Sequence, residues 1–307
     1  MDEKRAEEYI SLINQVLSCP SGKEPDVLSA HPELLDAELI DVMEQVSQGF
    51  AAEGDENTAQ FLNSIIILLA ESLELPLSDA NVDVDPQLNL LIQLLFMTEE
   101  SEANPDVIYP LLQKNLELLD DNFVASFKQW IHDTFTQAES EDAENLAVLT
   151  SAFSSLMQEF PTGNRRINLE VAIAGYESSI VFISPESLPE ECAATLYNLG
   201  NAYGDRVTQK EEKNHKDNFE AAIDCYQKAL KIYKLDKYPL EWAMTQNNLG
   251  NTFRDLGEIE EKAENLDKAI ACFEAALQIH THDRYPMEWE ITKNNLASAC
   301  KERDCSS

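Results

Sequence analysis

Hydrophobic residues recur at helical spacing along most of the chain. Ile223, Tyr226, Leu230 and Tyr233 stand three or four residues apart, which places them on one face of a helix. Comparable stripes predict helices over 6–17, 32–53, 58–74, 87–98, 105–137 with a break near Asp120, and 143–159. No run alternates between apolar and polar residues over the length of a strand. The pattern therefore predicts an all-α fold.

An internal repeat dominates the C-terminal half. The segment NFEAAIDCY at 218–226 recurs as NLDKAIACF at 265–273, and an earlier copy, NLEVAIAGY, lies at 168–176. A second motif, NNLGN at 247–251, recurs as NNLAS at 294–298. Each repeat thus predicts a helix A with the asparagine motif and a helix B with the AI motif. A single pair cannot bury its apolar stripe, so the pairs must stack into a solenoid.

Prolines mark the start of each A helix. Pro189, Pro239 and Pro286 each precede the asparagine motif and suit the first helical position, where the missing N–H costs little. The segment 287–301 has the A pattern with no B segment after it, which predicts a capping helix.

The pattern divides the chain into four parts. We expect an acidic helical module at 1–76, a linker at 77–86, a second helical segment at 87–137, and the solenoid with its capping helix at 138–307. The linker is assigned because its residues are polar and acidic and lack helical periodicity.

The chain is strongly acidic. It has 307 residues, with 22 Lys and Arg against 57 Asp and Glu, and a net charge of −35. Residues 1–160 hold 5 basic and 32 acidic residues, so most of the excess lies there. This sign disfavours nucleic acid and anionic membranes as ligands. Two interpretations stay open: the charge keeps the protein soluble, or it attracts a basic partner.

Three features of the sequence bear on the cellular compartment of the protein: its charged start, its short apolar runs and its cysteines. The start, MDEKRAEEY, is charged, and the most apolar run, 65–70, is far shorter than the ~20 residues of a membrane span. Six cysteines form no CxxC pair, and Cys225 and Cys272 occupy equivalent repeat positions. We expect reduced, core-packing cysteines in a cytoplasmic protein that does not insert into membranes.

The helix pairs resemble tetratricopeptide repeats, although the spacing of 47–50 residues exceeds the usual period of about 34. TKNNLAS at 292–298 is similar to kinesin-light-chain repeats. YPLEWAMTQNNLGNTF at 238–253 resembles a cyanobacterial group often fused to a caspase-like CHAT protease domain, as do HPELL at 31–35 and YPLL at 109–112. We expect no CHAT domain and no inherited protease activity, because the chain ends at 307.

No catalytic constellation is visible in the sequence. None of the five histidines stands in a strand–turn context with a cysteine, as a Cys–His dyad needs. The acidic linker lacks the glycine of a calcium loop, and neither a P-loop nor GxGxxG occurs. We expect neither an enzyme nor a metal or cofactor site.

The best candidate site is a row of amides on the A helices. Three-residue spacing places these side chains on one helical face, and an amide can bind the main chain of an extended peptide. Cations nearby could hold acidic groups of the ligand. The candidate residues are Asn198, Asn201, Asn247, Asn248, Asn251, Arg254, Asn294, Asn295, Ser298 and Lys301. Alternatively, the asparagines bond between adjacent helices and hold the stack together.

The expected function is that of an adaptor or scaffold, which binds a protein segment in the concave groove lined by A helices. One alternative is a regulatory subunit that acts in trans on a caspase-like protease. Another is an assembly chaperone for a large complex. The sequence leaves open the identity of the partner and the oligomeric state.

Overall fold

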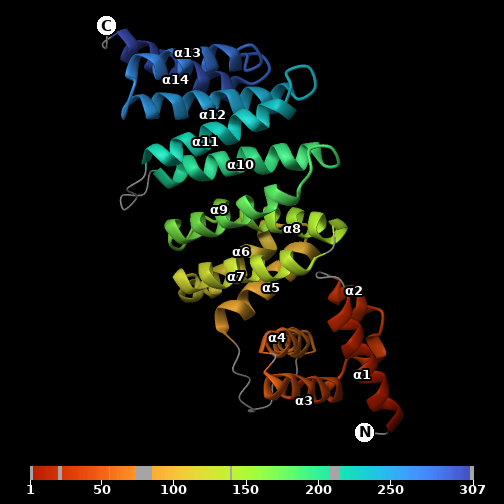
Figure 1. Cartoon of the computed structure of the whole chain (residues 1–307). Helices are drawn as coiled ribbons and strands as arrows, with labels where there is room; N and C mark the ends of the chain where they lie inside the picture. The colour runs from red at the N-terminus through yellow and green to blue at the C-terminus, as the bar shows by residue number, and fades with distance from the viewer. Residues whose placement is uncertain are drawn as a thin grey trace. The chain divides into compact units, whose positions relative to one another are not determined.

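The computed structural model describes residues 3–19, 23–54, 56–73, 85–138, 140–207 and 215–304 (Figure 1). In these ranges the regular elements are α-helices and two short 3-10 turns, and no strand occurs. The predicted all-α fold is confirmed. The chain forms two compact units, Met1–Leu156 with Pro161–Asn164 and Met157–Phe160 with Arg165–Ser307, here called unit 1 and unit 2.

Unit 1 begins with a small helical core. Its elements are α1 (Glu3–Ser18), α2 (Glu24–Ser29), η1 (Pro32–Leu34), α3 (Ala37–Glu53) and α4 (Glu56–Ser72). Tyr9 of α1, Met43 of α3 and Ile66 of α4 are fully buried in one cluster. The predicted single helix over 32–53 is wrong. Asp36 is extended and accepts a hydrogen bond from the Leu39 amide, which starts a new helix. The helix α2 was also not foreseen.

The second part of unit 1 contains α5 (Pro86–Glu100), α6 (Pro105–Lys114), η2 (Leu116–Leu118), α7 (Asp121–Gln137) and α8 (Ser140–Glu159), which continues past the unit boundary. The predicted break near Asp120 is confirmed. The Asp120 side chain accepts from the Asn122 and Phe123 amides and thereby caps α7. Phe127 of α7 packs edge-on against Phe153 of α8, with ring centroids 5.5 Å apart.

Unit 2 is the predicted stack of helix pairs. It contains α9 (Arg165–Phe182), α10 (Pro189–Val207), α11 (His215–Ile232), α12 (Pro239–Gly257), α13 (Lys262–Ala276) and α14 (Pro286–Asp304). The A helices α10, α12 and α14 begin at the three predicted prolines. Each of α10 and α12 packs most extensively against the B helix that follows it, and α14 packs on α13 (Figure 1). The fold is therefore a solenoid of helix pairs like those of tetratricopeptide repeats.

A glycine–aromatic contact joins the two helices of each complete pair. A Cβ atom on Gly200 of α10 would lie 2.7 Å from Cε1 of Tyr226 in α11. One repeat later, a Cβ on Gly250 would lie 2.7 Å from Cε1 of Phe273. Glycine is needed at both positions because the ring packs directly on the helix backbone. The equivalent residue of α14 is Ala297, which is exposed.

The predicted linker lies outside the described residues, apart from Asp85 and Pro86 at the start of α5. The four-part division of the chain therefore stays a prediction. Within the described residues, no helix is both long and apolar enough to cross a membrane.

Candidate functional site

The candidate site is one face of the A helices of unit 2, which we call the A-face. Helical spacing groups its members, since residues three, four and seven apart share a side. On α12 it consists of Leu240, Met244, Asn247, Asn251 and Arg254, and on α14 of Met287, Ile291, Asn294, Ser298 and Lys301. The second set lies 47 residues after the first, so the two rows occupy equivalent repeat positions.

Asparagines beside this face bond to one another across helices. Asn248 of α12 donates from Nδ2 to Oδ1 of Asn201 in α10, at 2.9 Å, and to the Tyr197 hydroxyl, at 3.0 Å. The Tyr226 hydroxyl of α11 donates to the same Asn201 oxygen at 2.7 Å. Burial raises the pKa of Tyr226 well above its ordinary value, so the hydroxyl stays protonated and remains a donor. These bonds tie three helices together.

The network continues to the last A helix. Asn247 donates to Oδ1 of its neighbour Asn248 at 3.2 Å, and Asn295 of α14 donates to Oδ1 of Asn247 at 3.3 Å. All three side chains are partly buried. Part of the predicted binding row therefore makes the contacts that the alternative interpretation expects, namely bonds that hold the stack.

Asn251 departs from this pattern. Its Oδ1 is buried and has no hydrogen-bond partner, whereas the equivalent oxygen of Asn201 accepts two bonds. Two donors are missing here: Phe273 occupies the position of Tyr226 and carries no hydroxyl, and Asn295, the equivalent of Asn248, donates to Asn247 instead. An unsatisfied buried acceptor of this kind is destabilising.

The remaining predicted residues differ in exposure. Asn294, Ser298 and Lys301 are exposed, and Asn198 is partly buried. Arg254 is already engaged, since Nε and Nη2 donate to Oδ1 of Asp255 at 3.0 and 2.9 Å. Burial raises the pKa of Asp255, and the neighbouring Arg254 opposes that rise. Lys301 is therefore the A-face cation best placed to meet a ligand.

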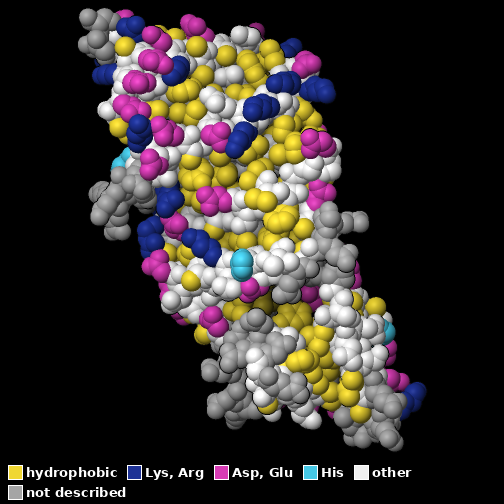
Figure 2. All heavy atoms as spheres, viewed as in Figure 1, with side chains coloured by type: hydrophobic (Ala, Val, Ile, Leu, Met, Phe, Trp, Pro, Cys, Tyr) yellow, Lys and Arg dark blue, Asp and Glu magenta, His cyan; other side chains and the backbone are white. Residues whose placement is uncertain are grey.

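Sequence reasoning missed the apolar part of the A-face. Met244, Met287 and Ile291 are 39%, 73% and 53% exposed, and all three lie on this one side of two A helices. Their spacing was a usable signal, because Met287 and Ile291 stand four residues apart and Ile291 is the repeat equivalent of Met244. Figure 2 shows hydrophobic side chains between charged ones over the region of α10 to α13.

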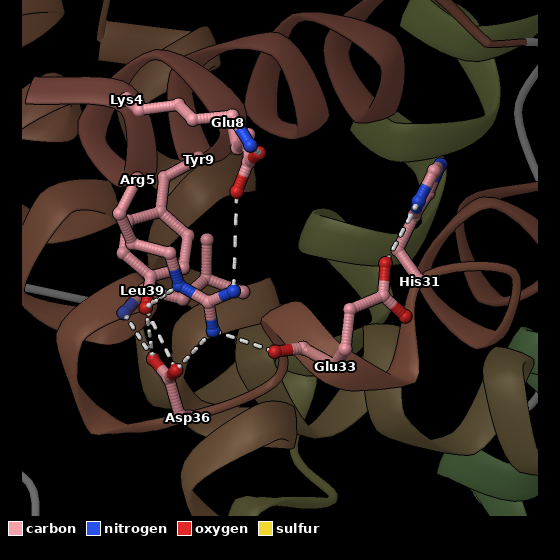
Figure 3. Close-up of polar contacts among 8 residues, drawn as sticks. All are labelled: Lys4, Arg5, Glu8, Tyr9, His31, Glu33, Asp36 and Leu39. Carbon is pink, nitrogen blue, oxygen red and sulfur yellow. Dashed lines mark hydrogen bonds and ion pairs between the residues drawn. The ribbon is translucent and has the colours of Figure 1, made fainter.

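A second polar cluster lies in unit 1 (Figure 3). The Tyr9 hydroxyl donates to both carboxylate oxygens of Asp36 at 2.7 Å, and Arg5 Nη2 donates to Oδ2 at 2.8 Å. Desolvation raises the pKa of Asp36, but the hydrogen bonds from Tyr9, Arg5 and the Leu39 amide outweigh it and lower the pKa overall. Both oxygens are occupied, so the cluster fastens α1 to the start of α3 and leaves no group for chemistry.

Cys192, Cys225 and Cys272 are unsuited to nucleophilic chemistry. Cys192 and Cys225 are buried, and burial raises the pKa of Cys225 to about 12 and that of Cys272 to about 11. A thiol with such a pKa is protonated at neutral pH and is a poor nucleophile. Over the parts of the chain that the structure describes, no three His, Cys, Asp or Glu residues are grouped as metal ligands.

Comparison with known proteins agrees with the helix pairs. Residues 242–283, which run from α12 through α13, match the tetratricopeptide repeat family. No curated protein matches the chain. The match and the stacked pairs of unit 2 together support a protein of the tetratricopeptide-repeat type. Repeats of this type support a role in protein–protein interaction.

Proposed function

We propose that this chain is a non-catalytic adaptor that binds a segment of a partner protein on the A-face of unit 2. The observation that carries the proposal is the exposed apolar set Met244, Met287 and Ile291 on two neighbouring A helices. Exposed apolar side chains that gather on one surface favour an interaction site, because burying them on a partner removes apolar surface from water.

The asparagine row has two roles in this proposal. One group bonds between helices, holds them in register and so shapes the face; it consists of Asn201, Asn247, Asn248 and Asn295. Asn294 and Ser298 are exposed and can bond to the main chain of a bound segment. A segment held in this way reaches micromolar affinity, about −8 kcal/mol, which suits reversible assembly.

We also propose a cellular location for the adaptor. The described cysteines are free thiols, and Cys192 and Cys225 are buried, which favours a cytoplasmic location. Action on a CHAT protease in trans rests on resemblance alone, and no contact among the described residues of unit 2 favours it or an assembly chaperone over an adaptor.

The test is capture of partners from host lysate by the full chain. Replacing Met287 and Ile291 together with Asp places charge on the apolar part of the A-face. We expect loss of the captured partner, with helicity unchanged by circular dichroism because both side chains are exposed. Val181→Asp is the matched control, since Val181 is 73% exposed on the B-type helix α9. Capture that survives the double substitution contradicts the proposal.

A further inference from the structure

We infer that the segment bound on the A-face carries a large apolar side chain and, about four or five residues away, a single carboxylate. This inference rests on the proposed function and specifies its ligand. It follows from the types of side chain along one exposed side of α14. Apolar side chains come first, an amide and a hydroxyl follow, and a cation comes last.

The apolar end lies in the first half of α14. Met287 and Ile291 are 73% and 53% exposed, and Met244 of α12 lies at the position equivalent to Ile291. Methionine is flexible and adapts to differently shaped apolar groups. This end therefore accepts a large aliphatic or aromatic side chain without fixing its identity.

This apolar character is not required by the repeat. The positions of α10 equivalent to Leu240 and Met244 are Glu190 and Ala194, in a helix that packs in the same way. The tyrosine hydroxyl of Tyr238 donates to Glu190 at 3.0 Å, so α10 uses that position for a polar contact. At these two positions α12 and α14 carry large apolar side chains and α10 does not, so stacking alone does not explain the apolar end.

The cationic end lies in the last turns of α14. Lys301 is exposed and makes no ion pair with the described residues. Its equivalent Arg254 is paired with Asp255, and Arg303 of the same helix is paired with Asp267 at 2.7 Å. Lys301 is therefore free to pair with a carboxylate of the ligand. The chain's net charge of −35 repels a long acidic run, so one carboxylate is favoured.

The spacing follows from helix geometry. Ten residues separate Ile291 from Lys301, which is about 15 Å along a helix at ~1.5 Å per residue. An extended peptide covers roughly 3.3 Å per residue, so four or five residues bridge that distance. Asn294 and Ser298 lie between the two ends and offer hydrogen bonds to the peptide backbone.

The test is selection of binders from a displayed library of random peptides on the full chain and on its Lys301→Glu variant. We expect peptides selected on the wild type to pair an apolar residue with an acidic one at this spacing. On Lys301→Glu, Lys or Arg should replace the acidic residue. A selected peptide should bind about fivefold more weakly to Lys301→Gln, because an exposed ion pair is worth at most about a few-fold to tenfold in affinity.

The outcomes separate the inference from the proposed function. Binders that depend on Met287 and Ile291 but show no spaced acidic residue, or no charge reversal on Lys301→Glu, overturn the inference and leave the proposed function standing. Binders that tolerate Asp at positions 287 and 291 overturn the proposed function and the inference with it. Selection that yields no binder counts against both.

Discussion

At the scale of single residues, Phe273 is one position where two equivalent repeats differ in hydrogen bonding. It packs against Gly250 as Tyr226 packs against Gly200, but it cannot donate to the buried Asn251 oxygen. We predict that Phe273→Tyr raises the unfolding free energy of unit 2 by about 1 kcal/mol, because a new hydroxyl satisfies that acceptor. Urea denaturation followed by circular dichroism measures the change.

The opposite substitution at the equivalent position of the preceding repeat, Tyr226→Phe, is the matched control for Phe273→Tyr. Tyr226→Phe should lower the unfolding free energy by about 1 kcal/mol or more, because it removes the donor to Asn201. If Phe273→Tyr destabilises unit 2 instead, the pocket around residue 273 is too tight for the hydroxyl and the repeat equivalence fails there.

His280 makes the stability of unit 2 depend on pH. It is 2% exposed, and its Nδ1 lies 2.9 Å from Oγ1 of Thr292 in α14. Burial lowers its pKa, and the nearby Glu288 only partly opposes this. Since the pKa is lower in the folded state, the unfolded chain takes up the proton first. Stability is therefore complete above the unfolded pKa of about 6.5 and falls as the pH drops below it.

The measurement for His280 is the urea midpoint of unit 2 at about pH 7.5 and about pH 5.5. We expect a lower midpoint at the acidic pH for the wild type and a smaller difference for His280→Gln, which cannot take up that proton. An equal acid shift in both proteins would assign the effect to other groups.

At the scale of helices, the glycine–aromatic contact sets how closely A and B approach. Gly250→Ala places a Cβ 2.7 Å from the Phe273 ring, so we predict a loss of about 1–3 kcal/mol in unfolding free energy. Gly204→Ala in α10 is the control, because a Cβ there meets no atom within 4 Å and alanine favours the helix. Thermal unfolding measures both, and the two substitutions should shift the midpoint in opposite directions.

The helices themselves were largely predictable from the sequence. The repeat and its prolines located α10, α12 and α14 because both can be read directly from the order of residues, without knowledge of tertiary contacts. The division between η1 and α3 was missed, since it depends on the Asp36 cap and on Tyr9 and Arg5 from a distant helix. The sequence left open whether Asn248 serves binding or stacking, because its partners Tyr197 and Asn201 lie about fifty residues away.

At the scale of the whole molecule, the two units differ in net charge. Unit 1 holds 31 acidic and 5 basic side chains, whereas unit 2 holds 26 and 17. Like charges repel in the compact state, and salt screens exposed charges over about 10 Å at 0.1 M. We predict that added NaCl raises the unfolding temperature of unit 1 more than that of unit 2.

Differential scanning calorimetry at low and moderate salt resolves this difference if each unit gives its own transition. The Phe273→Tyr protein identifies the transition of unit 2, because only that one should move. Equal salt shifts for the two transitions would mean that local ion pairs, rather than net charge, govern the response of unit 1.

The glycine–aromatic contact also bears on how such a chain can change in length. Gly200 meets Tyr226, and Gly250 meets Phe273, so each fit is completed within one repeat. Duplication or loss of a whole repeat therefore carries both halves of the fit together and preserves helix packing. An insertion that separates the glycine from its aromatic partner is tolerated only in the connecting loop. Gene rearrangements that respect this boundary can lengthen or shorten the stack without redesigning its interior.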